Sequence, residues 1–145
     1  VPDIKPEELA RLMRPDPKPE ELRMWCAVRC DLAMPVPKML VQCAHACLTS
    51  AIITLRQDPA RFWHWFENSQ AKRVVRVNTL ADLQRVKVEC ETVNIPSALV
   101  IDETRTVFHG VPAITYLGLG PCYRSELPNF VRRLRLLEEK DTNSG

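Results

Sequence analysis

A long apolar segment between two prolines limits the folds open to this chain. After Pro37 the sequence has no helix breaker until Pro59, and a proline suits the first turn of a helix because its missing N–H would have had no partner there. Apolar residues occupy nearly every side of this predicted helix, residues 38–58. We therefore expect it to pack on a sheet with one face and against another helix with a second face.

Strand-like and helix-like runs alternate along the rest of the chain. The apolar patterns predict strands at residues 24–30, 74–77, 98–101 and 114–119, and further helices at residues 60–66, 79–93 and 125–137. Gly120 and Pro121 are expected to end the last strand. This order predicts a single α/β domain in which a four-stranded mixed β-sheet is sandwiched between helices.

Composition agrees with one soluble domain. The 145 residues are 46% hydrophobic and 26% charged, as in ordinary globular proteins. No uninterrupted apolar run approaches the roughly 20 residues of a membrane span, so no membrane contact is expected. The six cysteines lie mostly within apolar patterns, which favours reduced thiols in an intracellular protein. We expect a cytoplasmic protein and leave mitochondrial association and homodimer formation open.

The N-terminal residues 1–23 read as an extension. They hold five of the twelve prolines and repeat one five-residue word, Lys5–Leu9 and Lys18–Leu22. In each copy the proline and two glutamates favour a short helical turn. The predicted organisation is an extension at 1–23, a domain at 24–137 and a polar tail at 138–145.

The candidate site begins where a buried strand ends in an acid. Asp102 follows the predicted strand 98–101, and Arg105 and Thr106 lie in the loop after it. If this strand runs parallel to the first strand, both carboxyl ends lie at the same sheet edge, where open α/β folds bind ligands. Asp102 would then meet Lys38 at the start of the long helix. The simpler alternative is that Asp102 and the threonines are ordinary turn residues.

Three short motifs carry a resemblance to a known family. They are Arg29–Met34 followed by Lys38 and Gln42–Ala46, then Leu99–Thr106, then Thr115–Pro121. In this order they resemble the signatures of the type 2 peptidyl-tRNA hydrolases, the archaeal and eukaryotic form. The resemblance implies hydrolysis of the ester between a peptide and the 3′ ribose of tRNA, with peptidyl-tRNA as the partner and without metal or cofactor.

The resemblance also assigns residues. It places the functional lysine at Lys38, the aspartate at Asp102, and the two catalytic threonines at Thr106 and Thr115. The substrate contacts expected beside them are Arg29, Asp31, Gln42, Arg105, Gly118 and Gly120. Carboxylate, hydroxyl and ammonium suit ester hydrolysis, which needs a positioned water, a proton acceptor and a donor to the carbonyl oxygen.

One departure keeps two other functions open. The segment Pro35–Pro37 stands where the family usually has a glycine-rich loop with an additional lysine. A catalytically inactive member that binds tRNA or a protein is therefore the second hypothesis. A third is a protein-interaction module that works through the charged extension.

Three further groups have structural alternatives that we prefer. Cys43 and Cys47, with Cys26, Cys30 and His45, could indicate zinc, but His45 points elsewhere on the helix and buried thiols are the better interpretation. The aromatic run at 62–66 is expected to cover the core and not to stack bases. Arg132, Arg133 and Arg135 are expected on the solvent face of the last helix, where they become a tRNA track only if that face adjoins the site.

Overall fold

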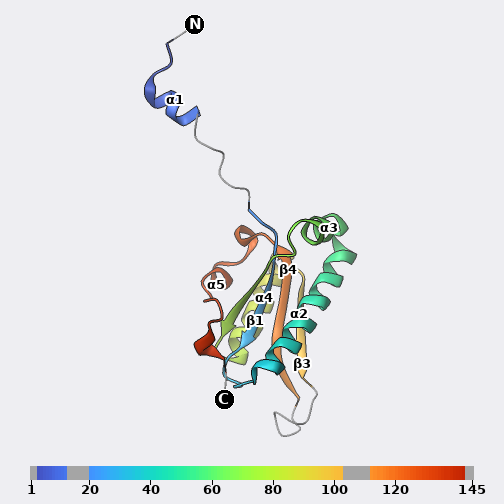
Figure 1. The fold of residues 1–145 in the computed structure, drawn as a ribbon. Coiled ribbons are helices and arrows are strands. Elements are labelled where there is room, and N and C mark those ends of the chain that lie inside the picture. The colour runs from blue at the N-terminus through green and yellow to red at the C-terminus, as the bar shows by residue number, and fades with distance from the viewer. Residues whose placement is uncertain (1–2, 13–19, 103–111, 143–145) are drawn as a thin grey trace.

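Four strands form one mixed sheet in the computed structural model, which describes residues 3–12, 20–102 and 112–142. The strands are β1 (Arg23–Arg29), β2 (Lys72–Val77), β3 (Ser97–Asp102) and β4 (Ala113–Cys122), in the spatial order β2-β1-β4-β3 (Figure 1). β1 and β2 are parallel, and β4 runs antiparallel to both β1 and β3. The predicted α/β class and the four-stranded mixed sheet are confirmed.

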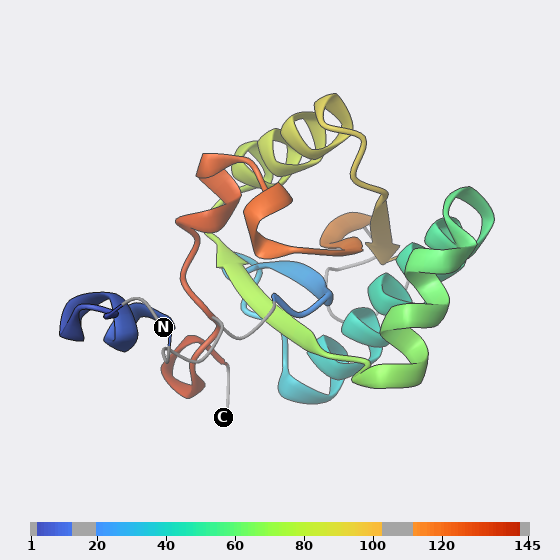
Figure 2. The ribbon, with the colours of Figure 1, turned by 90° about the horizontal axis from the view of Figure 1, so that it is seen from above.

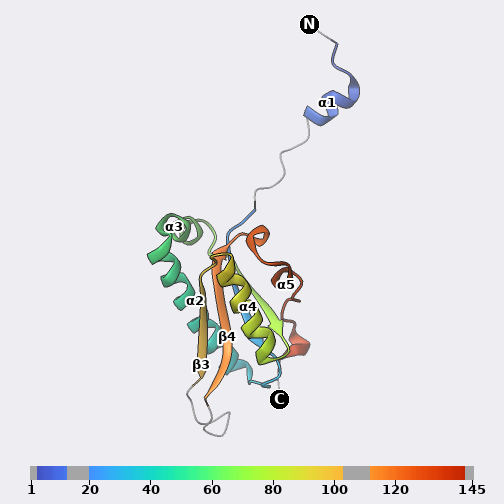
Figure 3. The same ribbon diagram turned by 180° about the vertical axis from the view of Figure 1, so that it is seen from behind.

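Helices cover both faces of this sheet. Helices α2 (Val36–Gln57) and α3 (Pro59–Asn68) lie on one face, and α4 (Leu80–Thr92) and the short α5 (Asn129–Arg132) lie on the other (Figure 2). The view from behind shows α4 across the near side of the sheet (Figure 3). Each face has its own apolar core, one around Leu83 and Leu117 and the other around Met24 and Tyr116. The sheet is therefore sandwiched as predicted.

Helix α2 spans the segment between the two prolines. It begins at Val36 and ends at Gln57, and Asp58 then caps α3 by accepting a hydrogen bond from the backbone N–H of Arg61. Its buried residues recur every three to four positions: Met39, Gln42, Ala46, Ser50, Ala51 and Thr54. Length and a mean hydropathy of 1.3 would also allow α2 to cross a membrane, yet this buried stripe packs on the sheet as in a core helix.

The predicted last helix at 125–137 is wrong. A 3-10 turn (η1, Arg124–Glu126) precedes the four-residue α5, and a second turn (η2, Glu139–Asp141) ends the described chain. Between them the backbone pairs with the sheet edge, because Arg76 N–H donates to the Arg135 carbonyl and Leu137 N–H donates to the Val74 carbonyl. These bonds satisfy edge groups of β2 that a helix would leave open.

Two smaller expectations also need correction. Strand β4 continues through Gly120 and Pro121, because Cys122 still pairs with Arg23 of β1. The first copy of the repeated word does form a helix, α1 (Pro6–Leu12). Of the second copy, the described residues Glu20–Leu22 are not helical, since Leu22 is buried in the core and the Glu20 carboxylate accepts two hydrogen bonds from Ser125.

Candidate functional site

An ion pair lies at the sheet edge where β1 and β3 end. Lys38 is in the first turn of α2 and Asp102 is the last residue of β3, and the Lys38 Nζ lies 2.9 Å from Asp102 Oδ1. β1 and β3 run in the same direction because both are antiparallel to β4. Their carboxyl ends therefore lie at the same end of the sheet, as the sequence predicts. Lys38 and Asp102, which are 64 positions apart in the sequence, meet there.

Burial makes this ion pair costly. The Asp102 side chain is 1% exposed and that of Lys38 is 15% exposed. Taking two charges out of water costs several kcal/mol for each ion, so a buried pair is weak evidence for stability. The carboxyl ends of the strands are where open α/β folds bind ligands, so a functional explanation for this pair is preferred to a structural one. The pair is therefore the strongest candidate for chemistry in the described chain.

A β-bulge places Thr115 against Gln42 of α2. Val100 pairs with Tyr116 and Ile101 pairs with Ile114, so Thr115 is an extra residue on β4. A bulge of this kind redirects a side chain and is frequent next to active sites. The buried Thr115 hydroxyl has two acceptors for its one proton, Gln42 Oε1 and the Val100 carbonyl oxygen, both at 3.4 Å. Gln42 lies one helical turn after Lys38 on the same face of α2.

Arg29 and Asp31 border the same edge. The guanidinium binds the Asp31 carboxylate with two nitrogens, at 3.1 and 2.7 Å, and donates a third hydrogen bond to the Ile114 carbonyl at 3.1 Å. Arg29 thus joins the end of β1 to the start of β4. The structure therefore brings six predicted site residues to one edge: Arg29, Asp31, Lys38, Gln42, Asp102 and Thr115. Arg105 and Thr106 fall outside the described residues.

The two predicted glycines lie elsewhere. A Cβ at Gly118 would lie 2.3 Å from the Ala46 carbonyl oxygen, so its absence lets α2 approach β4. Gly120 has a φ of +83°, in the left-handed region that favours glycine. Both are buried under the second half of α2, towards the opposite end of the sheet from Asp102. Packing explains both glycines, and their contact with substrate stays a prediction.

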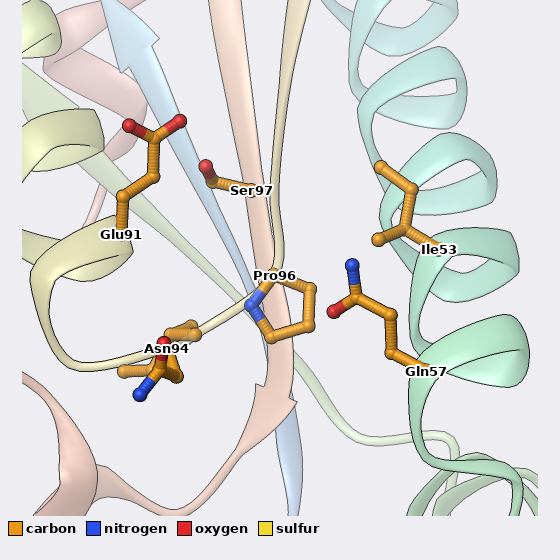
Figure 4. Close-up of a pocket in the computed structure, with 7 residues that line it drawn as sticks. Ile53, Gln57, Glu91, Asn94, Pro96 and Ser97 are labelled. Carbon is orange, nitrogen blue, oxygen red and sulfur yellow. The ribbon is translucent and has the colours of Figure 1, made fainter.

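A hollow at that opposite end lacks the parts of a catalytic site. It encloses about 420 Å³ and is lined by Gln57 of α2 and by residues 94–97 before and at the start of β3 (Figure 4). Its carboxylate, Glu91, is paired with Lys87 on α4. Among the residues that line it, no acid and base are arranged to activate a water.

The same end of the sheet carries a second ion pair near the surface. Arg61 of α3 binds the Glu126 carboxylate at 2.7 and 3.0 Å. These hydrogen bonds hold the pKa of Glu126 below its usual value, and they raise the pKa of Arg61. The pair ties α3 to the turn after β4, which is a structural role.

Sequence reasoning underestimated three cysteines. The sulfurs of Cys26, Cys43 and Cys47 all lie within 4.8 Å of one another. The spacing of Cys43 and Cys47 predicted a shared helix face, but only the packing of α2 on β1 adds Cys26. His45 is exposed, so the five-residue zinc hypothesis does not hold.

The aromatic run divides between core and surface. Phe62 and Trp65 are buried, as predicted, whereas Trp63 and Phe66 are 46% and 44% exposed. Phe62, Trp65 and Phe66 line an apolar groove of about 470 Å³ between α2 and α3, whose other wall includes Cys43 and Cys47. The core-covering prediction is therefore confirmed for two of the four rings.

Comparison with known proteins agrees with this geometry. A family model described as peptidyl-tRNA hydrolase PTH2 matches residues 22–137. A peptidyl-tRNA hydrolase of Thermoplasma acidophilum is 33% identical over 115 residues, which cover 79% of this chain and 97% of that protein. One from Saccharolobus islandicus is 31% identical over 120 residues, covering 80% and 99%. One from Thermococcus sibiricus is 35% identical over 96 residues, covering 65% and 79%.

Proposed function

Because this chain belongs to the PTH2 family of peptidyl-tRNA hydrolases, we propose that it hydrolyses the ester between a peptide, or an N-blocked aminoacyl group, and the 3′ end of tRNA. The reaction adds water across the ester and releases free tRNA. The observation that carries the proposal is the buried Lys38–Asp102 pair at the carboxyl ends of β1 and β3. The matched segment includes both residues.

The pair supplies two of the groups that the reaction needs. We assign Asp102 to orient the attacking water and to accept a hydrogen bond from it, since a carboxylate is an acceptor when ionised. We assign Lys38 to the negative charge that develops on the ester carbonyl oxygen, or to the tRNA end, since an ammonium has three N–H donors. A site that excludes water strengthens both interactions.

Hydroxyl groups complete the proposed machinery. Thr115 reaches the site through the bulge in β4 and contacts Gln42, so we assign it to support the position of the reacting groups. Thr106 is proposed as the hydroxyl that links Asp102 and Lys38. The assignment of Thr106 rests on the family resemblance alone.

An arginine cluster supports a path for the tRNA backbone. Arg76, Arg133 and Arg135 line a hollow of about 360 Å³ with Asn78, at the carboxyl end of β2. β2 is parallel to β1, so this hollow lies at the same end of the strands as Asp102, with β1 and β4 between β2 and β3. If Arg133 and Arg135 each bind one phosphate, replacing both by glutamine lowers the slope of log affinity against log salt by about 1.4 to 1.8.

The deciding experiment measures release of N-acetyl-aminoacyl groups from tRNA in the presence of a chelator. The parent is compared with Asp102→Asn and Lys38→Ala, and with the matched surface variants Asp82→Asn and Lys87→Ala on α4. We expect the parent and both surface variants to release the N-acetyl-aminoacyl group from tRNA at similar rates. Asp102→Asn should lose about 10²- to 10⁴-fold in rate, and Lys38→Ala about 10²- to 10³-fold.

Circular dichroism and unfolding midpoints control for folding in every variant. Full activity of a folded Asp102→Asn protein would contradict the assignment of Asp102. Turnover that depends on added metal would contradict the metal-free reaction.

One observation favours a catalytically inactive member of the family as the second candidate. Pro35 and Pro37 flank the first residue of α2, and neither has a backbone N–H. Helix N-termini bind phosphate through such N–H groups, so this N-terminus has fewer donors to offer a tRNA phosphate. Retention of tRNA without ester cleavage by the parent protein would select this candidate.

We also propose that the N-terminal extension recruits a protein partner. Two apolar side chains of the extension are exposed: Ile4, just before α1, is 49% exposed, and Leu9, within α1, is 46% exposed. Since Glu20 and Leu22 contact the domain, the deletion that tests the extension ends at residue 19. Partner capture should disappear while hydrolysis is kept.

A further inference from the structure

Three thiols meet where α2 crosses β1. Cys26 lies on β1, and Cys43 and Cys47 lie one turn apart on α2. The sulfurs of Cys26 and Cys47 are 3.3 Å apart, and all three sulfurs lie within 4.8 Å of one another. A single buried thiol packs as a small apolar group, but three sulfurs in mutual reach form a set of soft ligands.

The spacing of the sulfurs suits a metal ion between them. A metal about 2.3 Å from each of three sulfurs in one plane sets those sulfurs about 4 Å apart. The observed separations of 3.3 to 4.8 Å bracket this value. Shifts well under 1 Å, within side-chain rotation, would bring all three sulfurs to bonding distance. The ligands come from a central strand and a long helix, which hold them in place.

Of the three thiols, only Cys47 has surroundings that favour thiolate, the form that binds metal, because the pKa values of Cys26 and Cys43 are raised by hydrogen bonding and by burial. Hydrogen bonds from Cys26 and then from Cys43 lower the pKa of Cys47, and the Lys72 ammonium adds to this effect while burial opposes it. Lys72 likewise acts to lower the pKa of Cys43, although that pKa is raised overall. A positive charge beside a set of thiolates also offsets part of their negative charge.

The cluster borders the apolar groove between α2 and α3. Cys26 is fully buried, whereas Cys43 and Cys47 line the apolar groove between α2 and α3. The opposite wall of that groove carries Phe62 and Trp65, with Lys72 at its rim. An ion can therefore enter along the groove, and apolar side chains limit the access of water and of hard, strongly hydrated cations.

The ligand set points to the identity of the ion. Thiolate ligands select Cu(I) and zinc among the common metals, and structural zinc takes four protein ligands. Among residues 3–12, 20–102 and 112–142, no fourth cysteine, histidine or carboxylate joins the three sulfurs. We propose that Cys26, Cys43 and Cys47 form a three-sulfur site for a soft univalent cation, Cu(I), separate from the Lys38–Asp102 pair.

Titration of the full-length reduced protein with Cu(I) tests the site. Cu(I) is supplied without oxygen from a coloured chelator in excess, and the chelator spectrum reports the transfer. We expect one Cu(I) per chain and three sulfur neighbours by X-ray absorption. Cys43→Ala and Cys47→Ala should each weaken binding at least tenfold. The matched control is Cys30→Ala, another half-buried thiol outside the cluster, which should bind as the parent does.

A second measurement needs no substitution at the buried Cys26. Bound Cu(I) should protect the half-buried Cys43 and Cys47 of the folded parent protein from alkylation, as read by mass spectrometry, and leave Cys30 labelled. Binding no tighter than that of the double variant Cys43→Ala/Cys47→Ala would overturn the proposal. Equal weakening by Cys30→Ala would also overturn it.

Two other outcomes would replace Cu(I) by a different chemistry. If zinc at equal concentration displaces Cu(I), the preference for a univalent cation is wrong. If Cu(I) is not held but hydrogen peroxide converts the Cys26 and Cys47 thiols to one disulfide with release of two waters, the cluster is a redox pair and the metal site is overturned.

Discussion

Two buried polar clusters lie under the same helix, and they differ in charge. Under the first half of α2, Lys38 and Asp102 form an ion pair, and the Thr115 hydroxyl lies 3.4 Å from Gln42 Oε1 and from the Val100 carbonyl oxygen. Under the second half, the hydroxyls of Ser50 and Thr54 donate to the Gly120 carbonyl at 2.6 and 2.9 Å. The polar side chains of both clusters are buried, except that of Lys38, which is 15% exposed.

The difference separates function from packing. Neutral hydroxyls bound to a backbone carbonyl satisfy a buried acceptor at little cost. A buried ion pair costs more to desolvate than a well-packed apolar pair of similar size. The charged cluster under the first half of α2 therefore needs a functional explanation. The neutral cluster under the second half fixes α2 on the sheet.

The largest effect is expected when the charged cluster loses one partner. Lys38→Met leaves the Asp102 carboxylate buried without its ammonium, so the free energy of unfolding should fall by about 3 to 5 kcal/mol. Adding Asp102→Leu should restore most of this loss while activity stays absent. Urea unfolding measures both. The control Lys87→Met removes a surface ion pair and should lower the free energy of unfolding by less than about 1 kcal/mol. An equally small loss of stability in Lys38→Met would contradict the difference between the charged cluster and a surface pair.

Gly118 tests the close approach of α2 in the neutral half. In Gly118→Ala the new Cβ meets the Ala46 carbonyl, and we expect a loss of about 1 to 3 kcal/mol, as for an overpacked core. The free energy of unfolding should change and KM should not. A higher KM at unchanged stability would instead support the predicted substrate contact of this glycine.

Removal of a hydroxyl should affect stability in the neutral cluster and activity in the charged cluster. Ser50→Ala or Thr54→Val each removes one hydrogen bond to Gly120 and should cost about 1 kcal/mol of stability, with kcat/KM unchanged. Thr115→Val should lower kcat/KM about tenfold or more and change stability by about 1 kcal/mol. Initial rates and unfolding curves on the three proteins decide. Loss of activity in Ser50→Ala would show that the clusters are not separate.

The surface pair between α3 and η1 should give the smallest effect, and one that depends on pH. Because Arg61 lowers the pKa of Glu126 in the folded chain, the ionised form stabilises the fold above the unfolded pKa of about 4.3, and this contribution is lost as pH falls through the folded value. After allowance for solvent screening, Glu126→Gln should cost about 0.5 to 1 kcal/mol at pH 7. The free energies of unfolding of the parent and of Glu126→Gln should become equal in acid. A constant difference across the titration would contradict the role of the charge.

Local patterns in the sequence predicted most of the fold. The prolines bound α2, the apolar runs marked all four strands, and the motifs gave the family and the pair Lys38 and Asp102. The error at 125–137 has a physical cause. A helical apolar pattern there competes with the open edge of β2, and pairing with Val74 and Arg76 satisfies backbone groups that the pattern does not show.

The sequence by itself determined the four strands and the helices before residue 125, because helix and strand periodicity and proline are properties of short segments. It also determined the family and therefore the expected reaction. Only the tertiary structure decided which side chains meet. The bulge that directs Thr115 to Gln42, the sulfur of Cys26 beside those of Cys43 and Cys47, and the burial of Asp102 against Lys38 each join residues from different elements. Such contacts depend on strand register and on the distance between α2 and the sheet. Residues far from these contacts along the chain, such as Gly118, fix that distance.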